Sequence, residues 1–210
     1  MTREFIINEL NVTDLFNWEH IKNSLLLCIQ RKGDEEICKR DFLDMEQYVR
    51  VIVDEESRAT YKVRPDMLKK FGITEEILFQ TAINCTKQKV LIEDMAKMMA
   101  ELTGMSIEEV IEMQGDTPPM VVVTNKYKAY GAAVICLTEV LQEIADTYKN
   151  DLAILPSSIH ECILYPVDEL ADFRQFDAIV RDVNATQLEP EEVLSNHAYR
   201  FIREENRIVY

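Results

Sequence analysis

The chain has 210 residues, of which 47% are hydrophobic and 8% aromatic, enough apolar material for one large domain or two small ones. Its 38 acidic residues outnumber its 23 basic ones, which gives a formal net charge of −15 at pH 7. A surface of this charge repels nucleic-acid phosphates and anionic lipids, so we expect neither nucleic acid nor a membrane as a partner, and the acidity also favours solubility.

The first half of the chain is predicted to be rich in helices. Apolar residues between Leu15 and Ile29 recur at roughly helical spacing, which predicts an amphipathic helix over 14–32. Alternating residues then predict one β-hairpin over about 47–64, with the run 54–57 as its turn. Further helices are predicted at 65–72, along the apolar stripes 77–85 and 91–102, and after the capping-box pair Ser106 and Glu109. The methionines of the stripe 91–102 are interpreted as core filler rather than as an adaptable binding groove.

The segment 115–119 (GDTPP) is the clearest internal break. Beyond it the sequence predicts strands at 120–124 and 131–137, a helix from Thr138, strands at 152–155 and 161–165, a helix over 168–184, and a terminal hairpin over 197–210. We therefore predict an α+β fold of strand-strand-helix units around an antiparallel or mixed sheet. Its helical N-terminal half would be 1–115 and its mixed ββα-ββα-ββ part 116–210, packed as one globular unit.

Candidate catalytic residues gather in a polar connection between two apolar runs. Ser157, Ser158, His160 and Glu161 supply nucleophile, base and acid types within five positions. His197 is distant in the sequence, and only folding could bring it beside them. No G-x-S-x-G elbow accompanies the serines. Pro-Ser-Ser is ordinary turn chemistry in which the hydroxyls bond local backbone, so we favour a turn and keep a hydrolase as the alternative.

His160 and His197 are also the candidates for a metal site. They lie 37 positions apart without HExxH spacing, which makes metal binding the weaker alternative. By alternation, His197 shares a strand face with Tyr199 and Phe201 and is expected to be half-buried and hydrogen-bonded. No glycine-rich phosphate loop occurs, so we expect no cofactor.

Targeting signals and cysteines point to the cytoplasm. The N-terminus lacks the basic start and apolar stretch of a signal peptide, and no apolar run approaches the ~18 residues of a membrane span. The five cysteines are scattered without a CxxC pair, as expected for buried thiols in a reducing compartment.

Several segments carry a resemblance to a known family. The runs 121–133 (VVVTNKYKAYGAA), 151–166 (DLAILPSSIHECILYP) and 180–201, with 42–53 and 71–78, resemble a family of uncharacterised cytoplasmic proteins. That family, a domain of unknown function, occurs in anaerobic Gram-positive bacteria, often on or near mobile elements, and the PSSIHE run is its most specific mark here. The resemblance implies a shared fold and a chain shortened at its N-terminal side. It implies no mechanism, because the family has no established reaction.

These observations favour a non-catalytic module that binds another protein. The carboxylate-rich segments 107–113 and 168–182 would select a basic partner. The competing hypothesis is a hydrolase-like or metal-binding enzyme with a site around Ser157, His160 and His197. The oligomeric state stays open: 208–210 at the edge of the terminal hairpin would suit strand pairing in a homodimer.

Overall fold

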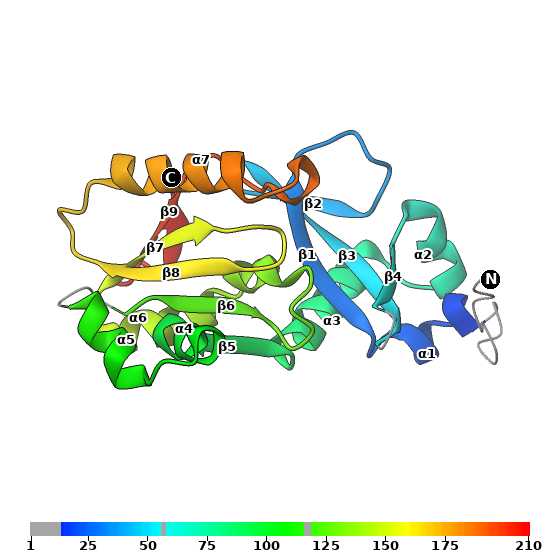
Figure 1. Cartoon of the computed structure of the whole chain (residues 1–210). Coiled ribbons are helices and arrows are strands. Elements are labelled where there is room, and N and C mark those ends of the chain that lie inside the picture. Colours follow the sequence, from blue (N-terminus) through cyan, green and yellow to red (C-terminus); the bar gives the residue numbers. More distant parts are fainter. Residues whose placement is uncertain (1–13, 56–57, 116–118) are drawn as a thin grey trace.

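The computed structural model of the chain describes residues 14–55, 58–115 and 119–210. Figure 1 shows two antiparallel sheets lying side by side, with helices packed against both. Parts of the predicted turn 54–57 and of the predicted break 115–119 lie outside the described residues. In the described part, no helix combines the length and apolarity needed to cross a membrane.

The first sheet, sheet A, is built around one long strand. It contains β1 (Leu25–Arg31), β2 (Lys39–Phe42), β3 (Met45–Asp54) and β4 (Ala59–Lys62), and β3 pairs with the other three. The free edge of β1 is covered by helix α3 (Glu75–Lys87). The Leu27 amide donates to Thr86 Oγ1 at 2.9 Å, and Lys89 Nζ lies 3.4 Å from the Leu25 carbonyl. Sheet A therefore presents no open edge along β1.

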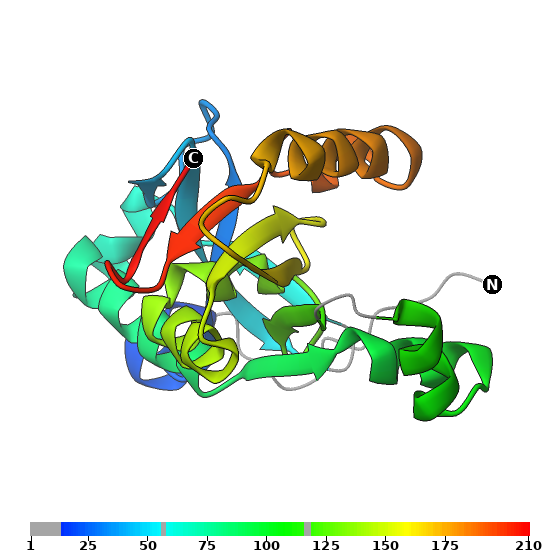
Figure 2. The ribbon, with the colours of Figure 1, turned by 90° about the vertical axis from the view of Figure 1, so that its left-hand side faces the viewer.

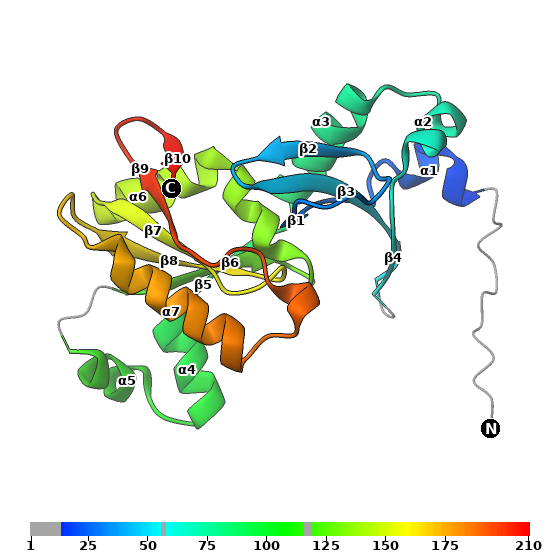
Figure 3. The same ribbon diagram turned by 90° about the horizontal axis from the view of Figure 1, so that it is seen from above.

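The second sheet, sheet B, has the strand order β10-β9-β7-β8-β6-β5 in the described part. Its strands are β5 (Val90–Asp94), β6 (Val121–Asn125), β7 (Asp151–Pro156), β8 (Cys162–Val167), β9 (Tyr199–Ile202) and β10 (Arg207–Val209). Neighbouring strands are antiparallel throughout, and β5 and β10 are the two edges. Helix α7 (Phe173–Thr186) lies along one face of this sheet, and α4 (Met95–Thr103) and α5 (Ile107–Gln114) lie to the same side (Figure 3).

The other described helical elements are three to fourteen residues long. They are η1 (Asp14–Phe16), α1 (Trp18–Ile21), α2 (Pro65–Phe71), α4 (Met95–Thr103), α5 (Ile107–Gln114), η2 (Gly131–Cys136), α6 (Thr138–Tyr148), α7 (Phe173–Thr186) and η3 (Pro190–Glu192). Helix α2 begins at a proline and ends at Gly72, whose φ of 67° is the left-handed conformation that glycine adopts without strain. The predicted capping box is present, since Ser106 and Glu109 exchange side-chain and backbone hydrogen bonds at the start of α5.

The main hydrophobic core runs without interruption from one sheet to the other. Leu27 and Val49 of sheet A belong to the same buried cluster as Val123, Ile154 and Leu164 of sheet B. The helical hairpin α4–α5 has a separate small core of its own, made by Ala96, Ala100 and Val110. It is therefore attached to the body of the protein rather than built into it.

The prediction of a helical N-terminal half is wrong. Residues 25–31 form β1 rather than the end of a helix, and β2 was not predicted at all. The run Leu25-Leu26-Leu27-Cys28-Ile29 is buried on both faces, so it shows no alternation and fits a helical stripe equally well. The mixed α+β class stands, but it is carried by two antiparallel sheets.

Two further elements differ from the predicted strand-strand-helix units. Residues 131–136 form the 3-10 helix η2 and not a strand, because this fully apolar run is wedged between β6 and β1. The stripe 91–102 is divided into β5 and α4, since the Asp94 carboxylate accepts hydrogen bonds from the amides of Ala96 and Lys97 and starts the helix there. Only the order β3-β4-α2 and the order β7-β8-α7 match the predicted unit.

Candidate functional site

The PSSIHE segment, residues 156–161, forms a tight turn between β7 and β8. The Ser158 hydroxyl accepts the His160 amide at 3.0 Å, and the Ser158 amide donates to the Glu161 carbonyl at 3.2 Å. Ser158 is buried, and its hydroxyl is engaged in a hydrogen bond within the turn itself. Ser157 is half-buried in a small apolar hollow against α7, with Leu155 among its neighbours. Neither serine has the arrangement of an activated nucleophile.

His160 joins this turn to two other segments. Its Nδ1 accepts the Tyr130 amide at 3.2 Å, and its Nε2 lies 3.3 Å from Glu192 Oε1. Because an amide is always a donor, Nδ1 carries no proton, and the Nε2 proton points to Glu192. Both ring nitrogens are therefore engaged, and neither is free to act as a general base.

The backbone of His160 makes an equally close contact. Its carbonyl accepts the Gly131 amide at 3.0 Å and the Thr124 hydroxyl at 2.8 Å. A Cβ on Gly131 would stand 2.2 Å from Thr124 Oγ1 and 2.7 Å from the His160 carbonyl oxygen, so no side chain fits at 131. No local pattern in the sequence marks Gly131, although the chain has only five glycines.

His197 belongs to a second cluster, where sheet A meets the terminal hairpin of sheet B. Its Nε2 lies 3.1 Å from Asp44 Oδ2, and its Nδ1 lies 3.0 Å from the Ala198 carbonyl oxygen. The buried Tyr199 hydroxyl donates to Asp44 Oδ1 at 2.5 Å, and the Tyr210 ring stacks on His197 with centroids 5.3 Å apart. Asp44 comes from the turn between β2 and β3, so this cluster connects the two sheets.

The pKa values in this cluster follow from burial and hydrogen bonding. Partial burial acts to raise the pKa of Asp44, but the hydrogen bonds from Tyr199 and His197 outweigh it, and the net result is a lowered pKa. Burial, together with the bond to Asp44, raises the pKa of Tyr199 far above its ordinary value. The hydroxyl therefore stays a donor and the carboxylate an acceptor at neutral pH.

The structure brings only some of the candidate residues together. Ser157, Ser158, His160 and Glu161 share one turn, whereas His197 lies in the other cluster and shares no hydrogen bond or ring contact with His160 in the described part. Among the described residues, no group of three or more His, Cys, Asp or Glu side chains is placed to hold a metal ion. The geometry gives the hydrolase and metal alternatives no support.

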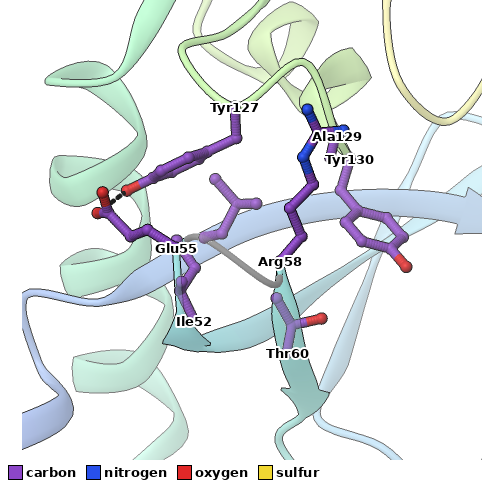
Figure 4. Close-up of a pocket in the computed structure, with 8 residues that line it drawn as sticks. Ile52, Glu55, Arg58, Thr60, Tyr127, Ala129 and Tyr130 are labelled. Carbon is purple, nitrogen blue, oxygen red and sulfur yellow. Dashed lines mark hydrogen bonds between the residues drawn. The ribbon is translucent and has the colours of Figure 1, made fainter. Parts of the chain in front are cut away.

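A pocket lies on the far side of Tyr130, at the seam between sheet A and the β6–η2 loop (Figure 4). Tyr127 donates to Glu55 Oε1 at 2.6 Å across one side, and the Arg58 side chain rises between Tyr127 and Tyr130. The cavity has a volume of about 20 Å³, room for a single water molecule. This seam is thus a packing feature and is too small to be a substrate site.

Comparison with known protein families shows which family the chain is related to. A family model described as a family of unknown function, DUF5688, matches residues 2–203. The chain belongs to the DUF5688 family. No curated protein and no solved structure matches it. The expected domain of unknown function is confirmed, while the bacterial source, the link to mobile elements and the shortened N-terminal side stay predictions.

The DUF5688 chain has a larger cleft beside its terminal hairpin. It has a volume of about 310 Å³ and is lined by α7 and the strands β9 and β10, with Phe173, Asp177, His197 and Tyr210 among its residues. Its polar groups are already engaged. The Asp177 carboxylate accepts the Ala198 amide at 2.9 Å, and Arg200, which also lines the cleft, forms an ion pair with Asp151 at 2.8 Å.

In the described part of the DUF5688 chain, five of the ten exposed large apolar side chains lie on the α4–α5 hairpin, which projects beyond the end of β5 (green in Figure 2). Leu102 is 84% exposed and Met113 75% exposed. The other exposed apolar side chains of this hairpin surface are Met99, Ile107 and Ile111. The interpretation of the methionines as core filler is therefore wrong for Met99, whereas Met98 is half-buried.

Proposed function

We propose that this protein is a cytoplasmic, non-catalytic module that binds a basic segment of another protein through the α4–α5 hairpin surface. The observation that carries the proposal is the exposure of five large apolar side chains on one protruding hairpin. Exposed apolar side chains gathered in one place, rather than scattered singly, mark interaction surfaces.

The charges on the hairpin favour a basic partner. Between Met95 and Gln114 the sequence has four glutamates and one lysine, and all five of these side chains are exposed. Carboxylates around an apolar patch select a complementary, positively charged surface and accelerate its association. A partner segment that alternates apolar and basic side chains would satisfy both features.

The segment 168–182, which the sequence suggested as a second acidic surface, is a poorer candidate. Helix α7 begins only at Phe173, and within it Asp177 and Asp182 are balanced by Arg174 and Arg181. Arg174 is in addition paired with Asp172 at 2.9 Å. We therefore assign the partner surface to the α4–α5 hairpin alone.

A photo-crosslinking experiment in the cells that express the protein tests this proposal. A photoreactive amino acid at position 102 or 113 should crosslink to one protein with a basic segment, and the adduct should decrease at high salt. The matched control is the same label at Ile77, which is 46% exposed beside Glu75 and Glu76 on α3. Identical adducts from positions 102 and 77, or no adduct from the hairpin, would contradict the proposal.

A further inference from the structure

Strand β5 is one of the two edge strands of sheet B and lies at the bottom of this sheet in Figure 1. It pairs with β6 from Val90↔Asn125 to Asp94↔Val121, and no other described strand pairs with it. The Lys126 amide bonds the Lys89 carbonyl and the Met95 amide bonds the Met120 carbonyl at the two ends of this ladder. In an antiparallel pair such bonds recur at every second residue. The backbone N–H and C=O groups of Leu91 and Glu93 therefore point toward β6. The backbone groups of Val90 and Ile92 then point away from the sheet.

Two other strand edges of the described part are less open. The edge of β1 is closed by Thr86 and Lys89. Strand β10, where the sequence predicts pairing across a two-fold axis, is only three residues long. Strand β5 has five residues and holds no proline, glycine or lysine, and its two charged residues, Glu93 and Asp94, stand at one end. Its central side chain, Ile92, is 46% exposed.

We propose that the β5 edge receives the partner segment as an additional β-strand, so that main-chain hydrogen bonds to Ile92 and its neighbours supplement the hairpin contacts. This inference rests on the proposed function, since β5 runs directly into α4 and the partner surface. Strand addition of this kind takes affinity from the backbone and specificity from alternate side chains.

Charge decides between the occupants of this edge. A second copy of the chain would bring another 15 net negative charges to an edge that ends at the exposed Asp94. A basic, extended segment of a different protein would instead be attracted to the edge and to the glutamates of the hairpin. The occupant is therefore a lysine- or arginine-rich strand with apolar residues at alternate positions.

A synthetic peptide of alternating lysine and valine serves as the probe, and a peptide with the same residues in two blocks is its control. We expect saturable binding of the alternating peptide to the full chain, with the Ile92 amide protected from hydrogen exchange only in the complex. The variant Ile92→Pro lacks the outward amide but leaves the bonds to β6 untouched. It should bind about tenfold more weakly, because one or more edge hydrogen bonds are lost. Ile92→Thr keeps the amide and should bind as the wild type does.

Ile92→Lys is a second variant, which tests the edge without introducing a proline that could disturb folding. Its charge should repel the probe and weaken binding as well. Equal binding by the wild type and by folded Ile92→Pro or Ile92→Lys, equal binding of the two peptides, or a dimer through β5 would overturn the inference. If the edge is disproved in this way, crosslinks from position 102 that persist in Ile92→Pro would still support the proposed function. Conversely, peptide binding at β5 without crosslinks from position 102 would support the β5 edge and contradict the hairpin surface.

Discussion

The amide of Gly131 donates to the carbonyl of His160 at 3.0 Å, and this contact fastens η2 to the PSSIHE turn. The approach is so close that a Cβ on Gly131 would stand 2.7 Å from the same oxygen and 2.6 Å from the Asn125 amide nitrogen. Both obstacles are backbone atoms, which cannot move without displacing β6 or the turn. The position thus requires glycine for reasons of space and not of backbone angle.

We predict that Gly131→Ala lowers the free energy of unfolding by about 2–4 kcal/mol, as expected for an overpacked site with no room to relax. Urea unfolding of the two proteins would measure the difference. Gly33→Ala is the matched control, because nothing lies within 4 Å of a Cβ there, and it should change stability by less than about 0.5 kcal/mol. Equal stability of the two alanine variants would show that the junction is looser than described.

The Asp44 carboxylate should make part of the stability dependent on pH. Its pKa is lower in the folded protein than in an unfolded chain, so its contribution is present above the unfolded pKa and is lost as the pH falls through the folded pKa. Asp44→Asn should therefore cost about 1 kcal/mol at pH 7, allowing for its partial exposure, and nothing in strong acid.

Urea unfolding at a series of pH values from about 2 to 7 would test this expectation, since the two stability curves should converge on the acid side. Asp41→Asn is the control, because Asp41 is exposed and forms only a surface ion pair with Lys32. Parallel curves for wild type and Asp44→Asn would show that Asp44 does not titrate with folding.

The terminal hairpin is expected to be part of the folded core. Removing the last ten residues deletes the fully buried Phe201 along with β10, and should lower the melting temperature by roughly 10 °C or more. A chain that ends at Asn206 keeps Phe201 and loses only β10 and the Tyr210 ring on His197, so its melting temperature should fall less. An unchanged melting curve for the ten-residue truncation would contradict this role.

Four thiols, those of the buried Cys28, Cys38 and Cys162 and that of the half-buried Cys136, should be chemically inert in the native protein. Burial raises the pKa of Cys28 to about 12 and that of Cys38 to about 11, and it raises those of Cys136 and Cys162 further still. Because the thiolate is the reactive form, these four cysteines should react with a disulfide reagent at pH 8 only after unfolding in urea. Rapid labelling of two or more thiols in the native protein would contradict this expectation, because Cys85 alone lies outside these four.

The C-terminal part of the fold is largely predictable from its sequence, and the N-terminal part is not. Strands β7 to β9 and helix α7 are bounded by turn residues and show clear periodicity, so their types follow from local patterns. Strand β1 and helix η2 are apolar on every side, and only their neighbours in the fold decide between strand and helix. Asp94 starts α4 in the middle of an apolar stripe, a boundary that a helical period alone does not reveal.

The candidate site shows the same division. That Ser158 bonds local backbone follows from its place after a proline, as the turn interpretation expected. That Glu192 and Tyr130 occupy the two nitrogens of His160 depends on segments 30 or more positions away, which no spacing rule connects. The exposure of Leu102 and Met113 could not be predicted either. An amphipathic pattern predicts a helix with an apolar side but does not indicate whether another element covers that side.

The separate small core of the α4–α5 hairpin has a consequence for how this protein can change during evolution. Ala96, Ala100 and Val110 hold the two helices together without help from the main core. Replacements on the outer side of the hairpin then alter what it recognises while the two sheets keep their stability. Selection can in this way redirect the molecule to a new target without a compensating mutation elsewhere, so related chains should diverge fastest between residues 97 and 113.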